Sequence, residues 1–272
     1  MTIYKSVTGK KKILKLYDEQ LGRLKTVYSD KWISTSFGET HLIETGNLVG
    51  IPLLVFHGGN ATTAYNLLAC DFLMNDFHIY AVDTIGHPGK SAGKVIDALG
   101  YESICCFGGS FGAGILAKLM CAAPEKVQRA GLYVPADIKN ASAINSMSMM
   151  FPMIMYWITH KDNWLKKCML PMAVTEENIT HDIYETAKLS INYTNVKAGM
   201  PSNVAGKDMK NCKAPTLVMA AEKDCLFPAK RVLPRAEQII ENVTTYLLVG
   251  RGHMSSLTES EKQMIIEFLK RE

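Results

Sequence analysis

Short apolar runs alternate with segments of helical spacing along most of the chain. The runs that predict strands cover 52–56, 77–82, 103–107, 130–134, 215–219 and 244–248. The segments that predict helices cover 62–73, 93–99, 111–122, 229–240 and 260–270. Because most of these strands are apolar throughout and lead into a helix, the pattern is typical of a mostly parallel sheet with helices on both faces. The predicted fold class is therefore α/β.

The N-terminal segment has a different pattern. Apolar residues fall in a helical stripe over 11–24, and the β-like runs 32–37 and 40–45 read as a hairpin. Five lysines accompany the stripe, namely Lys5, Lys10, Lys11, Lys12 and Lys15. We interpret them as the solvated face of a helix, with a membrane or nucleic-acid patch as the alternative.

One long segment lacks the strand pattern. Residues from about 138 to 204 predict helices and loops only, and they are rich in Met and Trp. The alternation resumes after them, so an insertion into one domain explains the chain more simply than two separate domains. We predict a core formed by 1–137 and 205–272, with 138–204 as a helical cap.

Composition and charge narrow the class of protein. The chain has 272 residues, 47% of them hydrophobic and 21% charged, which suits a globular protein with a large core. A net charge of +4 is too small to indicate nucleic-acid binding. The longest apolar stretch, 147–158, is too short to span a bilayer, so we expect no stable membrane association. Seven cysteines without a CxxC or zinc-ligand spacing, and a polar N-terminus, favour a reducing cytoplasm.

The sequence Gly-Gly-Ser-Phe-Gly at 108–112 fits the pattern G-x-S-x-G. It follows an apolar strand and opens a helix, which is the context of a nucleophile elbow. In such a turn Ser110 adopts strained backbone angles that expose its hydroxyl at a helix N-terminus, and small neighbours avoid clashes. The alternative is a glycine-rich turn with an incidental serine.

A serine nucleophile needs a base that is oriented by an acid. Asp224 and His253 each lie just past a predicted strand, at the edge where open α/β sheets place their sites, and the order Ser, Asp, His suits a nucleophile elbow. We therefore predict Ser110, Asp224 and His253 as catalytic residues. Glu222 competes for the role of the acid, because it lies nearer the strand on the same alternating face.

Two backbone amides are expected to stabilise an oxyanion. One is the amide of Phe111, directly after Ser110, and the other is the amide of Gly59, with Asn60 as the next candidate. His57 precedes the same glycine turn. We expect His57 to hold this loop by hydrogen bonds rather than to act as a base.

The remaining histidines and the Met-rich segment are weaker signals. His41, His78, His87, His160 and His181 form no metal-ligand pattern, so no metal site is predicted. His160 and His181 fall in the expected cap, where either could contact substrate. The methionines and tryptophans of the cap suit an apolar acyl or aryl group, yet we expect most of them to pack the cap onto the sheet.

Together these motifs resemble the α/β-hydrolase superfamily. The residues that carry the resemblance are His57-Gly58-Gly59, the segment 82–91 (VDTIGHPGKS), 108–112, Asp224 and Gly252-His253. It covers about residue 33 to the end, and the first helix with 33–38 is similar to the bacillus-type carboxylesterases that include naproxen esterase. The resemblance implies an α/β-hydrolase fold and ester hydrolysis under a helical cap, without a cofactor.

The chain departs from other branches of the superfamily. Dehalogenases and epoxide hydrolases carry Asp where Ser110 stands, and proline iminopeptidases carry a proline where Asn60 stands. Between Asp83 and Ser110 the chain is also shorter than its relatives in the superfamily, which have a loop and a full helix there.

The predicted function is therefore that of a serine carboxylesterase, with a small or medium apolar ester as its small-molecule substrate. A carbon–carbon bond hydrolase uses the same three residues, but its substrates are usually acidic and need a cation in the pocket. A non-catalytic binding module of the same fold is the other alternative. We expect no nucleic-acid partner, and a homodimer remains open.

Overall fold

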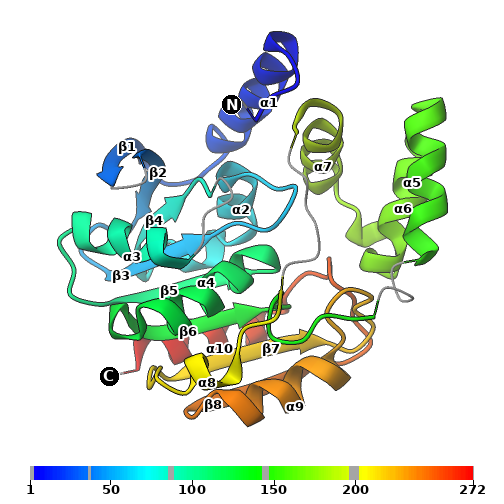
Figure 1. The fold of residues 1–272 in the computed structure, drawn as a ribbon. Coiled ribbons are helices and arrows are strands. Elements are labelled where there is room, and N and C mark those ends of the chain that lie inside the picture. Colours follow the sequence, from blue (N-terminus) through cyan, green and yellow to red (C-terminus); the bar gives the residue numbers. More distant parts are fainter. Residues whose placement is uncertain (1–2, 36–37, 85–88, 143–146, 196–201, 272) are drawn as a thin grey trace.

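An eight-stranded sheet with helices on both faces forms the body of the molecule (Figure 1). The computed structural model describes residues 3–35, 38–84, 89–142, 147–195 and 202–271. The strands are β1 (Tyr28–Thr35), β2 (Gly38–Gly46), β3 (Ile51–Phe56), β4 (Phe77–Val82), β5 (Ile104–Gly109), β6 (Val127–Tyr133), β7 (Thr216–Ala221) and β8 (Val243–Leu248). The helices are α1 (Val7–Leu21), α2 (Thr63–Ala69), α3 (Gly89–Ala98), α4 (Phe111–Ala122), α5 (Met147–Thr159), α6 (Asp162–Ala173), α7 (His181–Tyr193), α8 (Gly206–Met209), α9 (Ala229–Ile239) and α10 (Glu259–Lys270). The predicted α/β fold is confirmed.

The strand order places the predicted functional loops at one edge of the sheet. The order is β1-β2-β4-β3-β5-β6-β7-β8, and every neighbouring pair from β4 to β8 is parallel. The predicted hairpin is present as β1 and β2, which are antiparallel to each other, and β2 is antiparallel to β4. Because parallel strands end at the same edge, the loops after β3, β5, β7 and β8 come together there.

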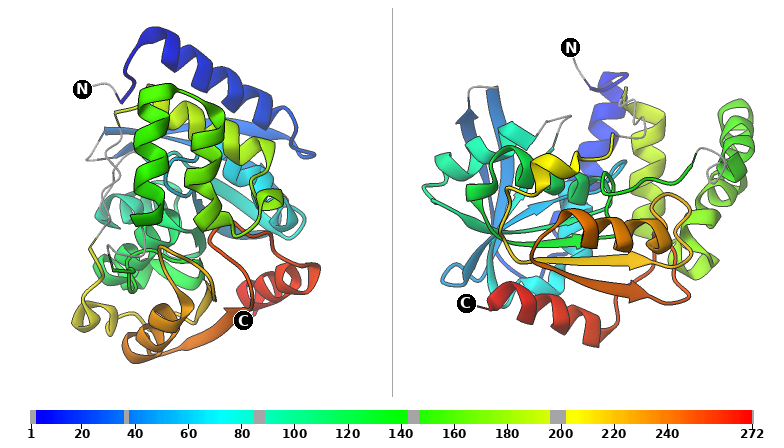
Figure 2. Two further views of the ribbon diagram at one scale, coloured as in Figure 1. Left: turned by 90° about the vertical axis from the view of Figure 1, so that its right-hand side faces the viewer. Right: turned by 60° about the horizontal axis from the view of Figure 1, so that its bottom comes forward.

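Alternate residues of the strands enter two hydrophobic cores, one on each face of the sheet. In β3, Leu54 belongs to the core beneath α3, α4 and α9, whereas Val55 belongs to the core beneath α2 and α10. The right panel of Figure 2 shows α9 and α10 on opposite sides of the strands. Cys106 and Cys105 divide in the same way, and both are buried thiols, as expected.

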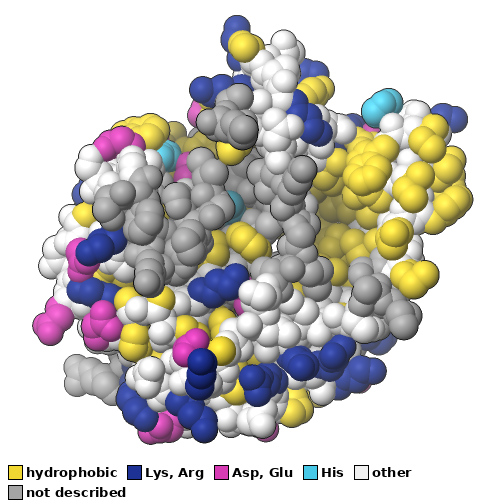
Figure 3. Space-filling view, viewed as in Figure 1, with side chains coloured by type: hydrophobic (Ala, Val, Ile, Leu, Met, Phe, Trp, Pro, Cys, Tyr) yellow, Lys and Arg dark blue, Asp and Glu magenta, His cyan; other side chains and the backbone are white. Residues whose placement is uncertain are grey.

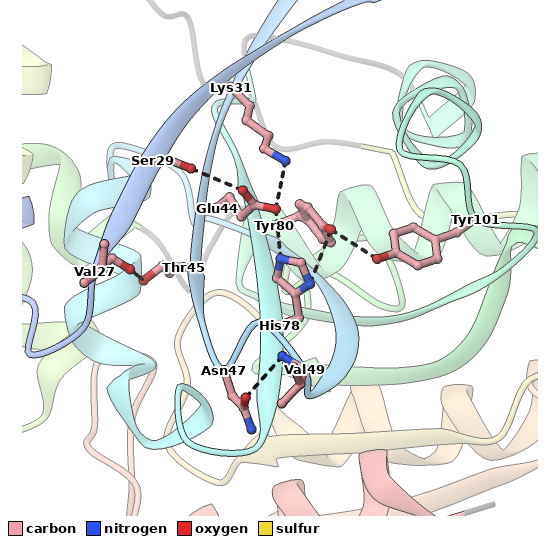
Figure 4. A network of polar contacts seen from close by, with 10 residues as sticks. All are labelled: Val27, Ser29, Lys31, Glu44, Thr45, Asn47, Val49, His78, Tyr80 and Tyr101. Atoms are coloured by element: carbon pink, nitrogen blue, oxygen red, sulfur yellow. Dashed lines mark hydrogen bonds and ion pairs between the residues drawn. The ribbon is translucent and has the colours of Figure 1, made fainter.

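A polar network holds β1, β2 and β4 together at the antiparallel edge of the sheet (Figure 4). The Lys31 Nζ and His78 Nε2 atoms lie 2.8 and 2.9 Å from Glu44 Oε1. The hydroxyls of Tyr80 and Tyr101 lie 3.1 Å apart and extend the network toward β5. Burial alone would raise the pKa of Glu44, but the hydrogen bonds from Lys31 and His78 outweigh it and hold this pKa below its usual value.

Several elements differ in extent from their predictions, three helices among them. The helix α1 begins earlier than expected because the Ser6 side chain accepts a hydrogen bond from the Gly9 amide and caps it. The helix expected over 62–73 divides into α2 and a separate 3-10 turn, η1 (Asp71–Leu73). The helix α3 begins at Gly89, so a helix does occupy the stretch that is shorter than in relatives.

Helices α5, α6 and α7, which we call the inserted helices, lie beyond the carboxyl ends of the parallel strands (Figure 1). They share a hydrophobic cluster of their own, which includes the buried Tyr156 and Tyr184. Helix α7 also packs on α1, where Gln20 Nε2 donates to Thr186 Oγ1 over 2.9 Å. The division of the chain into a core and a cap at 138–204 stays a prediction.

An ionic cluster joins α1 and β1 to the carboxyl end of β4. His41 on β2 places Nδ1 2.7 Å from Asp83 Oδ2 and Nε2 2.9 Å from Asp30 Oδ1. The Tyr17 hydroxyl of α1 donates to the same Asp83 carboxylate over 3.3 Å. The hydrogen bonds to Asp83 and Asp30 raise the pKa of His41 against the opposing effect of burial.

We predict that His41 makes stability depend on pH. Its pKa is higher in the folded chain than the unfolded value of about 6.5, so its contribution is complete below that pH and is lost as pH rises through the folded pKa. His41→Gln should therefore lower the urea midpoint more at about pH 5.5 than at about pH 8.5. Equal losses at the two pH values would contradict the assignment.

Candidate active site

The turn between β5 and α4 holds Ser110 in a strained conformation. Its backbone angles are φ 55° and ψ −120°, which a non-glycine residue rarely adopts. The turn is held because the Ser110 amide donates to the Tyr133 carbonyl over 2.9 Å and the Ser110 carbonyl accepts from Gly114 and Ala136. The strained strand-to-helix turn that the motif predicts is present, and it places the Ser110 side chain at the N-terminus of α4.

Two glycines of the motif are required by close backbone approaches. A Cβ atom on Gly108 would lie 2.7 Å from the carbonyl carbon of Gly112. A Cβ atom on Gly112 would overlap with the Phe56 carbonyl oxygen at the end of β3. Because backbone atoms cannot move aside as a flexible side chain does, the first turn of α4 can meet β3 and β5 this closely only with glycine at both positions.

The three predicted catalytic side chains form one hydrogen-bonded chain. His253 Nε2 lies 2.8 Å from Ser110 Oγ, and His253 Nδ1 lies 2.7 Å from Asp224 Oδ2. The imidazole packs edge-on against the Phe227 ring, with the ring centroids 5.4 Å apart. The loops after β5, β7 and β8 thus bring together residues that are far apart in the sequence.

Of the two candidate acids, Asp224 is hydrogen-bonded to His253, whereas Glu222 has a different partner. The Asp224 side chain is buried, and its other oxygen accepts from the amides of Leu226 and Phe227 at 2.7 and 2.9 Å. Burial alone would raise the pKa of Asp224, but the charge of His253 and these hydrogen bonds outweigh it and lower this pKa. The Glu222 carboxylate instead accepts from the Gly250 amide over 2.7 Å.

The loop that carries His253 rests on the inserted helices. The Met254 amide donates to the Met172 carbonyl of α6 over 3.1 Å. A Cβ atom on Gly252 would lie 2.5 Å from that same carbonyl oxygen, so this position accepts only glycine without rearrangement. From the other side, the Tyr133 hydroxyl donates to the Ser255 carbonyl over 2.5 Å. We did not predict these supporting residues from the sequence.

The loop after β3 lies against the serine turn. A Cβ atom on Gly59 would lie 3.6 Å from the Phe111 Cβ, and one on Gly58 would lie 3.6 Å from the Ser110 Cβ. The structure therefore brings Gly59 next to Phe111, the residue that directly follows Ser110, and the amides of these two residues are the predicted oxyanion donors. Their role in binding an oxyanion stays a prediction.

His57 holds this loop in place, as expected. Its Nε2 accepts from the Thr84 amide and lies 3.0 Å from the Thr84 hydroxyl, and its Nδ1 lies 2.9 Å from the Gly58 carbonyl oxygen. Burial lowers the pKa of His57, which favours the neutral ring that these contacts require. At the far end of the loop Asn60 has φ 53°, and its side-chain oxygen accepts from Ser190 Oγ of α7 over 3.2 Å.

The other histidines lie away from this hydrogen-bonded chain or outside the described residues. His41 and His78 belong to the polar contacts at the antiparallel edge, and His160 and His181 are exposed beside the ends of α5 and α7. His87 falls in 85–88, outside the described residues, as does part of the family-like segment around it.

The Met and Trp residues of the inserted helices divide into two groups. Met153, Met169, Met172 and Trp164 pack within the cluster of the inserted helices, where Met254 joins them next to His253. Others remain exposed, namely Met147, Met150 and Trp157. The expectation that most of them pack inward is therefore only partly correct.

Comparison with known proteins identifies two curated relatives, both carboxylesterases of Bacillus subtilis (strain 168). Carboxylesterase YbfK is 24% identical over 278 residues, covering 93% of this chain and 92% of the relative. The uncharacterized carboxylesterase nap is 23% identical over 277 residues, covering 89% and 86%. No protein-family model matches the sequence.

The crystal structure of naproxen esterase (carboxylesterase NP) from Bacillus subtilis has the same fold. It matches with a TM-score of 0.79 at 18% sequence identity, covering 98% of this chain and all of the other. The predicted resemblance to α/β-hydrolases of the Bacillus carboxylesterase type is confirmed. Among the residues that the structure describes, no helix is long and apolar enough to cross a bilayer.

We predict that Gly112→Ala destabilises the fold. The added methyl group would meet two backbone carbonyl oxygens, so the first turn of α4 must move away from β3 at a cost of about 1–3 kcal/mol. Gly93→Ala is the matched control, because its Cβ would meet the Ala123 Cβ at an ordinary 3.4 Å. Urea unfolding of both variants tests this, and equal stabilities would contradict the packing argument.

Proposed function

We propose that this homologue of the Bacillus carboxylesterases is a serine carboxylesterase that cleaves a small or medium apolar ester through an acyl-enzyme. The observation that carries the proposal is the hydrogen-bonded chain from Ser110 Oγ through His253 to Asp224. Both curated relatives are named carboxylesterases, and they match the chain over most of its length.

The first half of the reaction transfers the acyl group to the enzyme. His253 Nε2 takes the proton of Ser110 as Oγ attacks the ester carbonyl, and a tetrahedral oxyanion forms. His253 then gives this proton to the oxygen of the leaving alcohol, and the carbon–oxygen bond breaks. The Asp224 carboxylate keeps Nδ1 protonated and stabilises the charged imidazolium between these steps.

The second half returns the enzyme to its starting state. Water takes the place of the alcohol, His253 removes its proton, and the resulting nucleophile attacks the acyl-serine. The acid is released when Ser110 recovers the proton from His253. Every proton moves between a bound oxygen and one imidazole nitrogen, so these residues need no cofactor for the cycle.

The oxyanion is stabilised by backbone amides that are in place before the substrate arrives. We assign the amides of Gly59 and Phe111 to this role, because Phe111 directly follows Ser110 and Gly59 lies against Phe111. Fixed donors of this kind are typically each worth about 3–4 kcal/mol in the transition state. His57 and Thr84 keep the Gly59 loop in position through their hydrogen bonds.

The apolar side chains next to His253 favour an apolar substrate. The inserted helices contribute Met153 and Met172 to a hydrophobic cluster that includes Met254, the neighbour of His253. Flexible thioethers adapt to acyl or aryl groups of irregular shape. We therefore expect uncharged, apolar acyl groups to be preferred over acidic ones.

The carbon–carbon bond hydrolase is the second candidate, and the local charges do not favour it. Its acidic substrates need a cation, but two basic side chains near the serine already have other partners. Arg251, two residues before His253, binds Glu261 and the Ser256 carbonyl, and Lys118 of α4 pairs with Asp137. A non-catalytic module would have no need for the complete hydrogen-bonded chain.

The proposal also includes the cellular compartment and the partners of the protein. Seven free cysteines, with Cys105 and Cys106 buried beneath opposite faces of the sheet, suit a reducing cytoplasm. We expect no nucleic-acid partner, and dimerisation stays open.

We predict that the protein hydrolyses p-nitrophenyl esters and that Ser110→Ala removes this activity. Turnover of a series from acetyl to palmitoyl esters should show a preference that reports the depth of the acyl site. The variant should keep the urea midpoint of the wild type, because the change only shortens one side chain. A folded wild type that turns over none of the series would contradict the esterase assignment.

Replacing each carboxylate by its amide distinguishes the roles of Asp224 and Glu222. We predict that Asp224→Asn lowers kcat roughly ten-thousand-fold, because the amide no longer holds His253 in the required tautomer. Glu222→Gln should keep nearly full activity, since its carboxylate contacts the Gly250 amide instead. Equal losses in the two variants would show that the acid has been misassigned.

A further inference from the structure

An apolar stripe runs along the outer face of α5. It consists of Met147, Met150, Phe151, Ile154, Trp157 and Ile158, which recur at helical spacing of three and four residues. These side chains are between 45% and 70% exposed. Figure 3 shows hydrophobic side chains gathered over α5 and α6. Such a large contiguous apolar surface is unusual on a monomeric protein and marks an interaction site.

The stripe is not the face by which α5 packs on the rest of the protein. The opposite face of the helix carries the buried Tyr156, and Met153 packs in the cluster of the inserted helices. Met149, on the same inner side, meets the sulfur of Cys225 at 3.9 Å. Because the inner face already holds α5 in place, the exposed stripe is free for an external partner.

Basic side chains flank the stripe. Within 147–173 the only acidic residue is Asp162, and it is paired with Lys188 of α7. The exposed Lys161 lies in the turn between α5 and α6, and the exposed Lys167 stands 4.7 Å from the centroid of the Trp164 ring. Trp164 in turn meets Phe151 of the stripe edge-on, with centroids 5.7 Å apart.

The lysines of α1 lie at the same end of the molecule as the turn between α5 and α6 (Figures 1 and 2). Four of them are exposed along the helix, namely Lys10, Lys11, Lys12 and Lys15. Lys12 contacts the Tyr193 hydroxyl of α7, so this part of α1 is held next to the inserted helices. The stripe and a basic surface therefore share one end of the protein.

We propose that the α5 stripe docks reversibly on an anionic lipid surface. Large aliphatic and aromatic side chains would enter the boundary between headgroups and acyl chains, while the flanking lysines contact the anionic headgroups. A second copy of the chain fits less well, because an isologous contact presents the same surface from both sides, and the only acidic residue within 147–173 is already paired with Lys188. The proposal replaces the expectation of no stable membrane association with a reversible contact, and it goes beyond the ester hydrolysis.

The test measures binding of the whole chain to vesicles. The probe is vesicles of about seven parts phosphatidylcholine to three parts phosphatidylglycerol, with pure phosphatidylcholine vesicles beside them. We expect the wild type to sediment with the anionic vesicles only, with a blue shift of its tryptophan fluorescence, and to be released by high salt. A wild type that stays in the supernatant with both vesicles would overturn the proposal.

A pair of double variants connects the binding to the stripe. Ile154→Ser with Ile158→Ser should weaken sedimentation about tenfold or more, and Trp157 remains as the fluorescent probe. The matched control is Val27→Ser with Val49→Ser, which changes two side chains that are 90% and 94% exposed away from α5 and should bind like the wild type. Both variants should keep the hydrolysis rate of p-nitrophenyl acetate, which separates loss of docking from loss of the fold or of the proposed activity.

Two further results would also overturn the proposal. One is equal sedimentation of both double variants, because the stripe would then make no contribution. The other is a wild-type dimer in analytical ultracentrifugation that the Ile154 and Ile158 changes dissociate, because a second copy would then be the occupant.

Discussion

The strained turn at Ser110 depends on how closely the backbone of α4 approaches β3 and β5. Gly108 and Gly112 allow this approach, since a Cβ at either position would lie well inside contact distance of backbone atoms. The Ser110 amide donates a hydrogen bond to β6, and the Ser110 carbonyl accepts hydrogen bonds from α4 and from the loop after β6. The positive φ angle of Ser110 thus costs conformational energy, and the hydrogen bonds to the surrounding sheet and loops maintain it. The positions of Phe111 and of the Gly59 loop follow from the same packing.

The geometry of His253 depends on a second close approach, between its loop and α6. Gly252 lies under the Met172 carbonyl, and Met254 bonds to that carbonyl. On the other side of the histidine, Asp224 is fixed by two amides of its own loop. The inserted helices therefore help to position His253. Asn60 and Ser190 make a similar connection between α7 and the loop after β3.

Much of the fold and the site could be predicted because their signals are local in the sequence. Apolar runs of strand length mark the parallel sheet, and G-x-S-x-G after such a run marks the serine turn. Asp224 and His253 could be found because both follow strands whose ends meet at one edge. The choice between Asp224 and Glu222 needed the structure, because a loop sequence does not show which of two nearby carboxylates is directed toward the histidine.

Contacts between distant segments could not be read from the pattern. The cluster of His41 with Asp83 and Asp30 joins strands that pair only in the folded sheet. The role of Gly252 depends on a carbonyl of α6, which no spacing in the sequence indicates. The outer face of α5 is as apolar as the face of a buried helix. From the sequence we therefore predicted that its side chains pack inward, whereas in the structure they are exposed.

Covalent labelling shows directly whether Ser110 is the nucleophile. The protein is treated with a fluorophosphonate, digested, and its peptides are identified by mass spectrometry. We expect one rapid adduct on the peptide that contains Ser110, and almost none in a folded His253→Ala variant, because the proposed mechanism activates the serine through that imidazole. An adduct on another residue, or equal labelling of the variant, would contradict the proposed nucleophile and its base.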